Sequence, residues 1–158
     1  MFKITIISVG ALKERYFAEA VAEYEKRCSA YAKIVNINLR EETLGAGHTG
    51  DIETALSRES MHILENLPPR AYKIALCVEG KSLTSEQFAS LCEKAKNERG
   101  ELCFVIGSSH GLDESVKAAC DFRLSVSALT FPHRLMRVIL TEALYRALSI
   151  SAGGKYHK

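Results

Sequence analysis

The feature that most constrains the fold of this chain is a regular alternation of short apolar runs with helix-like segments. Four of the runs are apolar nearly throughout, and they lie at Phe2–Val9, Ala71–Val78, Glu101–Gly107 and Phe122–Val126. A fifth run, Lys33–Arg40, alternates apolar with polar residues, which is typical of a strand near the edge of a sheet. Strands without alternation are buried on both faces, as in parallel sheets covered by helices on both sides. The sequence therefore predicts an α/β fold with a mostly parallel sheet and helices on both faces.

Five helix-like segments separate or follow these runs. They lie at Lys13–Tyr31, Ile52–Leu67, Ser85–Asn97, Asp113–Cys120 and from Pro132 to about Ile150. Asp51 is the expected N-cap of the second segment, and Thr84 or Ser85 that of the third. The residues of the second segment expected to face the core are Ile52, Leu56, Ile63, Leu64 and Leu67. The chain has no internal repeat or low-complexity linker, so we expect residues 1–158 to form a single domain.

Composition narrows the class of protein. The net charge of +2 is too small to indicate nucleic-acid binding, yet the stretch from Pro132 to Lys158 holds five basic residues and one acid. Such a locally basic face suits a polyanion, or only improves solubility. The five cysteines are widely spaced without a metal-binding pattern, so we expect reduced thiols and no metal. No apolar run reaches 18 residues, so we expect a cytoplasmic protein without a membrane span.

Three loops are expected to form the ligand site, because parallel sheets bind ligands beyond the carboxyl ends of their strands. These loops are Leu76–Lys81, Gly107–Leu112 and Ser125–Phe131, and they are rich in small residues that let a ligand approach the backbone. Neither a phosphate-binding P-loop nor a GxGxxG fingerprint is present. A neutral, adenosine-like or methionine-like ligand therefore remains a candidate for this site. His48, in the glycine-rich stretch 41–50, is expected to be solvated.

The final helix is apolar around more than half of its circumference. It is either fully buried or packed on a second copy, and its arginines favour a homodimer. His133 and Arg137 are four residues apart and are expected to share a face at its start, as part of a site or of a solvated basic turn. Tyr156 and His157, between two lysines, form either a frayed tail or a group that stacks on a nucleobase beside a phosphate.

Three stretches together resemble one known family. They are the loop IGSSHGL, the segment LSVSALTFPHRLMRVILTEALYRA and the terminal YHK, and the likeness extends from Lys3 to the last residue. The chain is similar to the RlmH-type (YbeA-type) methyltransferases of the SPOUT superfamily. This resemblance implies a C-terminal trefoil knot, a homodimer with its sites near the subunit interface, and no requirement for a metal. It also implies transfer of a methyl group from S-adenosylmethionine to N3 of a pseudouridine in 23S rRNA of the assembled ribosome.

The resemblance also implies which residues bind the cofactor. By position they are Leu76, Gly107, Val126, Ser127, Ala128, Leu129, Thr130 and Phe131. One departure is Ser108, which stands where the family usually has a second glycine. A serine would be strained there if the backbone had a positive φ.

The chemistry indicates which catalytic groups to expect. The methyl group is already activated by its sulfonium, so the enzyme must align the nucleophilic nitrogen and help N3 to lose its proton. The candidates are Arg137, to stabilise the resulting anion, and His133, Tyr156 or His157, to orient the base or to relay the proton. The alternatives are a non-catalytic ribosome-binding factor and a Rossmann-type enzyme, and SVGALKERY after the first strand lacks the fingerprint that the latter needs.

Overall fold

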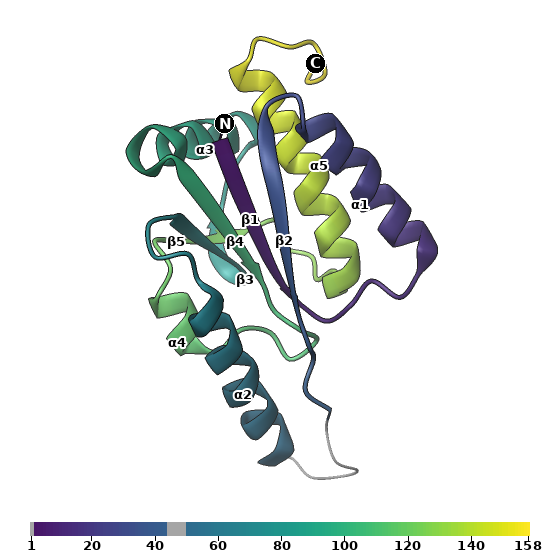
Figure 1. The fold of residues 1–158 in the computed structure, drawn as a ribbon, viewed down its shortest axis with the longest axis vertical. Coiled ribbons are helices and arrows are strands. Elements are labelled where there is room, and N and C mark those ends of the chain that lie inside the picture. The colour runs from purple at the N-terminus through teal and green to yellow at the C-terminus, as the bar shows by residue number, and fades with distance from the viewer. Residues whose placement is uncertain (1, 44–49) are drawn as a thin grey trace.

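The computed structural model describes residues 2–43 and 50–158, so His48 lies outside the described residues. Five parallel strands form one sheet in the order β2-β1-β4-β3-β5 (Figure 1). The strands are β1 Phe2–Val9, β2 Ala32–Leu39, β3 Tyr72–Ser82, β4 Glu101–Ile106 and β5 Phe122–Ser125. The helices are α1 Arg15–Cys28, α2 Gly50–Asn66, α3 Ser85–Arg99, α4 Glu114–Ala118 and α5 His133–Ser151. The predicted α/β class and the edge position of the second strand are confirmed.

Helices cover both faces of the sheet (Figure 1). On one face α1, α3 and α5 pack against Ile4 and Ile6 of β1, and on the other α2 and α4 pack near Ile7 and Val9. Successive side chains of a strand point to opposite faces, so a strand buried on both sides must be apolar at nearly every position. This explains the continuous apolar runs. Within the described ranges no helix is long and apolar enough to cross a membrane. The trefoil knot and the single-domain boundary stay predictions.

The prediction for α2 is wrong at its start and wrong for part of its inward face, although Ile63 is buried as predicted and Leu67 packs against the core. The helix begins at Gly50, so Asp51 lies in its first turn instead of capping it. Ala55, Glu59 and Ile63 are buried, whereas Ile52 and Leu64, expected in the core, are exposed at 44% and 39%. The buried stripe follows helical spacing, but a carboxylate occupies its middle position. An assignment based on apolar residues alone therefore misses Glu59 and places Ile52 and Leu64 inside.

Strand β3 is longer than predicted. The expected turn Glu79-Gly80-Lys81 belongs to the strand, and the pairing of β3 with β5 shifts register between Leu76 and Lys81. A Cβ atom on Gly80 would lie 2.6 Å from the backbone carbonyl carbon of Leu124. Only glycine allows the two strands to approach this closely, and their contact continues along the mouth of the candidate site described next.

Candidate active site

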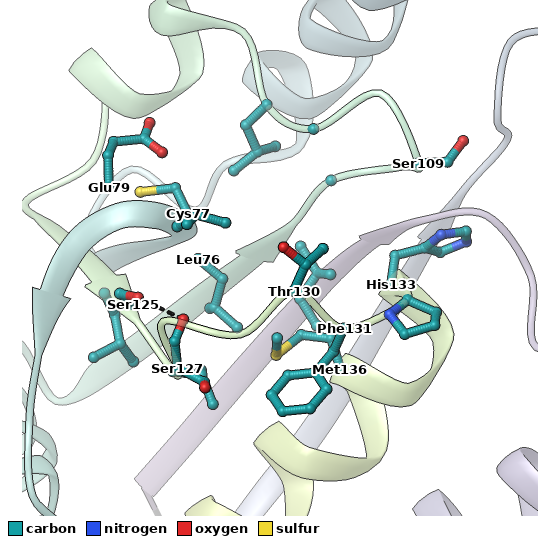
Figure 2. A pocket seen from close by; sticks show the side chains of 18 of the residues that line it. Leu76, Cys77, Glu79, Ser109, Ser125, Ser127, Thr130, Phe131, His133 and Met136 are labelled. Atoms are coloured by element: carbon teal, nitrogen blue, oxygen red, sulfur yellow. Dashed lines mark hydrogen bonds between the residues drawn. The ribbon is translucent and has the colours of Figure 1, made fainter.

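A cavity of about 930 Å³ opens at the carboxyl ends of β3, β4 and β5 (Figure 2). The three loops predicted from their position after strands all contribute to it. The predicted cofactor residues that line the cavity are Leu76, Gly107, Val126, Ser127, Leu129, Thr130 and Phe131. Ala128 does not line it. Seven of the eight positions implied by the family resemblance therefore converge on one cavity.

The loop after β4 is closed by a backbone hydrogen bond of 2.9 Å from the Gly111 N–H to the Ser108 carbonyl. Gly107 has no room for a side chain, because a Cβ atom there would lie 2.4 Å from the Gly111 carbonyl oxygen. Gly111 has a φ of +84°, whereas Ser108 is not among the residues of positive φ. The strain considered for Ser108 is therefore absent, and its hydroxyl has another role.

Two carboxylates hold this loop from outside the cavity. The Ser108 hydroxyl donates to Oε1 of Glu59 at 2.7 Å, and both side chains are almost fully buried. The Ser109 hydroxyl donates to Oε1 of Glu41 at 2.8 Å, and the Glu42 N–H donates to the second oxygen of Glu59 at 3.0 Å. Sequence reasoning missed Glu41 and Glu59. The only signal was the spacing of Glu59, four residues from Ala55 and from Ile63.

Glu41, Glu59 and His110 place their potential ligand atoms within 4.8 Å of one another. The sequence predicts no metal, and the geometry alone would allow a cation here. Both carboxylates already accept hydrogen bonds from the loop serines, so they have a structural task without a metal.

The loop from Ser125 to Phe131 is shaped by its own serines. The Ser125 hydroxyl donates to the Ser127 carbonyl at 3.1 Å, and the Ser127 hydroxyl accepts from the Leu129 N–H at 3.0 Å. Beneath them the cavity has an apolar floor that includes Leu76 and Ile106, and at its mouth Leu129 is 71% exposed. Apolar walls with backbone groups and hydroxyls suit an uncharged heterocycle better than a phosphate.

A charged pair lies at the rim of the cavity. Lys117 of α4 forms an ion pair with Glu79 of β3, and both line the cavity. The hydrogen bond from Lys117 keeps the pKa of Glu79 below its ordinary value. The rim therefore offers an anionic and a cationic group to a zwitterionic ligand.

His133 is the one predicted catalytic residue that lines the cavity. Burial lowers the pKa of its imidazole, and the charge of Glu41 opposes that effect. Arg137, expected on the same face, is only 6% exposed and does not line the cavity. Burial lowers the pKa of its guanidinium, with the nearest opposing charge on Glu25 of α1. The expectation of a shared site face is wrong, because Arg137 is buried in the fold and does not line the cavity.

The C-terminal tail is docked on its own chain rather than frayed. Tyr156 donates to Glu142 at 3.1 Å and lies under the Arg146 guanidinium, 4.7 Å from the ring centre. His157 contacts Glu86 of α3 at 2.8 Å and Arg146 at 3.2 Å. Figure 1 shows this tail at the end of α5 opposite to its start. Tyr156 and His157 therefore lie away from the cavity of their own chain.

Comparison with known proteins gives consistent results. Residues 2–157 match the family described as "Predicted SPOUT methyltransferase". Two relatives carry the name "Ribosomal RNA large subunit methyltransferase H". The one from Caldicellulosiruptor bescii is 44% identical over 98% of this chain and 99% of its own. The one from Bacillus pumilus is also 44% identical, with the same coverage.

Two solved structures share the fold at low identity. A probable methyltransferase from Bordetella pertussis Tohama I superposes with a TM-score of 0.53 at 14% identity, covering 93% of this chain and 94% of the other. The tRNA (m1G37) methyltransferase from Aquifex aeolicus gives a TM-score of 0.50 at 13% identity, covering 90% and 69%. At such identities the likeness concerns the fold alone.

Proposed function

Because the chain belongs to the SPOUT methyltransferase family, we propose that it methylates N3 of a pseudouridine in 23S rRNA of the assembled ribosome, with S-adenosylmethionine as donor. The relatives named as methyltransferases of large-subunit ribosomal RNA support the RNA class. The observation that carries the proposal is the convergence of β3 and of the loops after β4 and β5 on one cavity of about 930 Å³. A ribosomal substrate also places the protein in the cytoplasm.

The cavity suits the donor in size and in chemistry. Gly107 and Gly111 pack too closely for a side chain at residue 107, so the backbone of this loop itself lines the cavity. Leu76, Gly107 and the lining residues between Val126 and Phe131 would hold the donor, and Glu79 with Lys117 would meet its charged end. The donor brings a methyl group already activated by a sulfonium, so the chain needs no covalent nucleophile and no metal.

The residues of this chain must align the nucleobase and remove the N3 proton. His133 stands in the cavity wall and is well placed for the second task. Arg137 would need to leave its buried position to reach the base. It therefore fits a structural role better than the anion-stabilising role expected from the sequence.

A homodimer would complete the site. The 19 residues of α5 span about 27 Å at 1.5 Å per residue, so the tail cannot reach its own cavity while it is docked as observed. Leu135, Val138 and Ile139 form a half-buried apolar strip on α5, and Leu129 is exposed at the cavity mouth. A second copy packed on α5 would cover this strip. It would also bring Tyr156 and His157 of one chain toward the cavity of the other, where the basic tail can meet RNA.

The test is methyl transfer to ribosomes from a strain that lacks its own enzyme of this class, with mass spectrometry of the modified nucleoside. We expect one methyl group on one pseudouridine, and much slower transfer to naked RNA. The alternative, a non-catalytic ribosome-binding factor, predicts ribosome binding with no heat signal on titration with S-adenosylmethionine. That combination would reject the proposal.

A further inference from the structure

The side chains of Glu41 and His133 both approach the same glycine, Gly10. Gly10 ends β1 with a φ of +100°, and a Cβ atom built there would lie 3.0 Å from Nε2 of His133 and 3.6 Å from Oε2 of Glu41. The three residues come from the end of β1, the end of β2 and the start of α5. A side chain at residue 10 would occupy the space in which the imidazole faces the carboxylate.

The two nitrogens of the His133 ring differ in environment. Nε2 is fully buried and has no hydrogen-bond partner. Nδ1 also has no partner in the part of the chain that the structure describes, but it is not fully buried. It is therefore open to solvent. Figure 2 shows the ring on the side of the cavity where Ser109 lies. The negative charge of Glu41 acts on the ring without a hydrogen bond, and it favours the tautomer that carries its proton on the buried Nε2, which leaves the Nδ1 lone pair free.

The surrounding charges keep this pair in the required states. Four groups act on His133: Glu41 after β2, Arg134 on α5, Glu14 before α1 and Glu59 on α2. Glu14 is itself paired with Arg134 at 2.7 Å, and the two charges offset each other. Among the carboxylates, Glu41 therefore has the largest effect on the pKa of the His133 ring. Burial outweighs these charges and lowers the imidazole pKa, which keeps the ring neutral at pH 7.

Glu41 in turn remains an anion. Partial burial raises the pKa of its carboxyl group, but two effects together outweigh it. They are the hydrogen bond from Ser109 and the charge that His133 carries at the acid pH where a carboxyl group titrates. The same carboxylate therefore holds the cofactor loop through Ser109 and faces His133.

We propose that His133 is the base that accepts the N3 proton and that Glu41 is the positioning residue that sets its tautomer. The inference rests on the proposed function. The N3–H bond breaks, the proton bonds to Nδ1, and N3 uses its freed electron pair to bond the methyl carbon. The electron pair of the broken carbon–sulfur bond stays on sulfur. Glu41 stabilises the imidazolium until the proton passes to water.

The experiment compares Glu41→Gln with Ser109→Ala. Ser109→Ala removes the hydrogen bond to Glu41 but keeps the charge of this carboxylate. Glu41→Gln removes the charge but keeps an amide oxygen that can accept the Ser109 hydroxyl. We expect the single-turnover rate of the wild type to rise with pH and reach a plateau. In Glu41→Gln the inflection moves to lower pH, because the charge that opposes burial is gone, and the plateau falls at least about tenfold. Ser109→Ala keeps the inflection of the wild type.

A second measurement needs neither ribosome nor donor. The His133 ring is titrated by NMR and assigned with His133→Gln. Its midpoint should fall in Glu41→Gln and stay in Ser109→Ala. Unchanged midpoints and rate profiles in Glu41→Gln would overturn the inference while the wild-type activity upholds the proposed function. A wild type that methylates no ribosomal RNA would overturn both, and the NMR midpoints would still report whether Glu41 acts on His133.

Discussion

The hydroxyl of Ser108 donates a 2.7 Å hydrogen bond to the buried carboxylate of Glu59, which ties the loop after β4 to helix α2. Glu59 also accepts the Glu42 N–H, so both oxygens are used. In Glu59→Gln one of these donors loses its acceptor. An unsatisfied buried donor costs about 1–3 kcal/mol, and we expect urea unfolding to show a loss of that size. Glu65→Gln, on the exposed side of α2, is the matched control and should change little.

Gly107→Ala should impair donor binding more than folding. Its Cβ would lie 2.4 Å from the Gly111 carbonyl oxygen, so the backbone of this cavity-lining loop has to shift. We expect calorimetry to show S-adenosylmethionine affinity lowered at least about tenfold, or roughly 1.4 kcal/mol. Ala128→Ser adds one atom to the neighbouring loop at a position that does not line the cavity, and it should bind nearly as the wild type does. Equal affinities in both variants would remove this loop from the binding site.

Cysteine labelling should report on the cavity. Cys77 lines it, whereas Cys120 is similarly accessible but does not. Burial raises the pKa of both thiols, so labelling with a maleimide should be slow at pH 7 and faster toward pH 9. Saturating S-adenosylmethionine should protect Cys77 and leave the Cys120 rate unchanged. If S-adenosylmethionine protected Cys77 and Cys120 equally, the protection would indicate a general stiffening of the chain and not a ligand bound in the cavity.

Because Tyr156 holds the docked tail, the free energy of unfolding should fall at alkaline pH. Burial, followed by the hydrogen bond to Glu142, raises the pKa of Tyr156 from 10.0 to about 12. A raised folded-state pKa gives stability that is complete below pH 10 and is lost as pH rises toward 12. Thermal unfolding should show this loss in the wild type and less of it in Tyr156→Phe. Tyr16→Phe, at an exposed ring, should follow the wild type.

Ile139→Asp should separate the proposed dimer. The residue lies half-buried on the apolar strip of α5, and a carboxylate there would be desolvated without a partner. We expect sedimentation to show dimer affinity lowered about 30-fold or more, together with loss of methyl transfer. Ile52→Asp makes the same change on α2, on the opposite face of the sheet, and should stay dimeric. An active Ile139→Asp monomer would contradict a site completed by a second copy.

Much of this arrangement could be predicted from the sequence, because it depends on local patterns. The run Phe2–Val9 became β1 with the predicted ends, and Thr84 caps α3 with a full capping box that includes Gln87. The cavity followed from the rule that parallel sheets bind ligands at the carboxyl ends of their strands.

The rest depends on contacts between distant residues. Glu59 appears polar and exposed until Ser108, 49 residues away, supplies its partner. Arg137 is expected from its spacing to share a site face with His133, but in the folded chain it is buried and does not line the cavity. The Gly80 turn remains in β3 because β5 lies against it. Each of these errors arose because neighbours in space were unknown.

Helix α5 also fixes the distance between the cavity and the C-terminal tail. One rigid element joins His133 in the cavity wall to the tail beyond Ser151, so its residue count sets both the separation and the relative direction of the two ends. One added residue would lengthen the helix by about 1.5 Å and rotate everything after it by about 100°. Evolution can therefore vary side chains along α5 far more readily than it can insert or delete a residue there. Related enzymes should differ in length elsewhere.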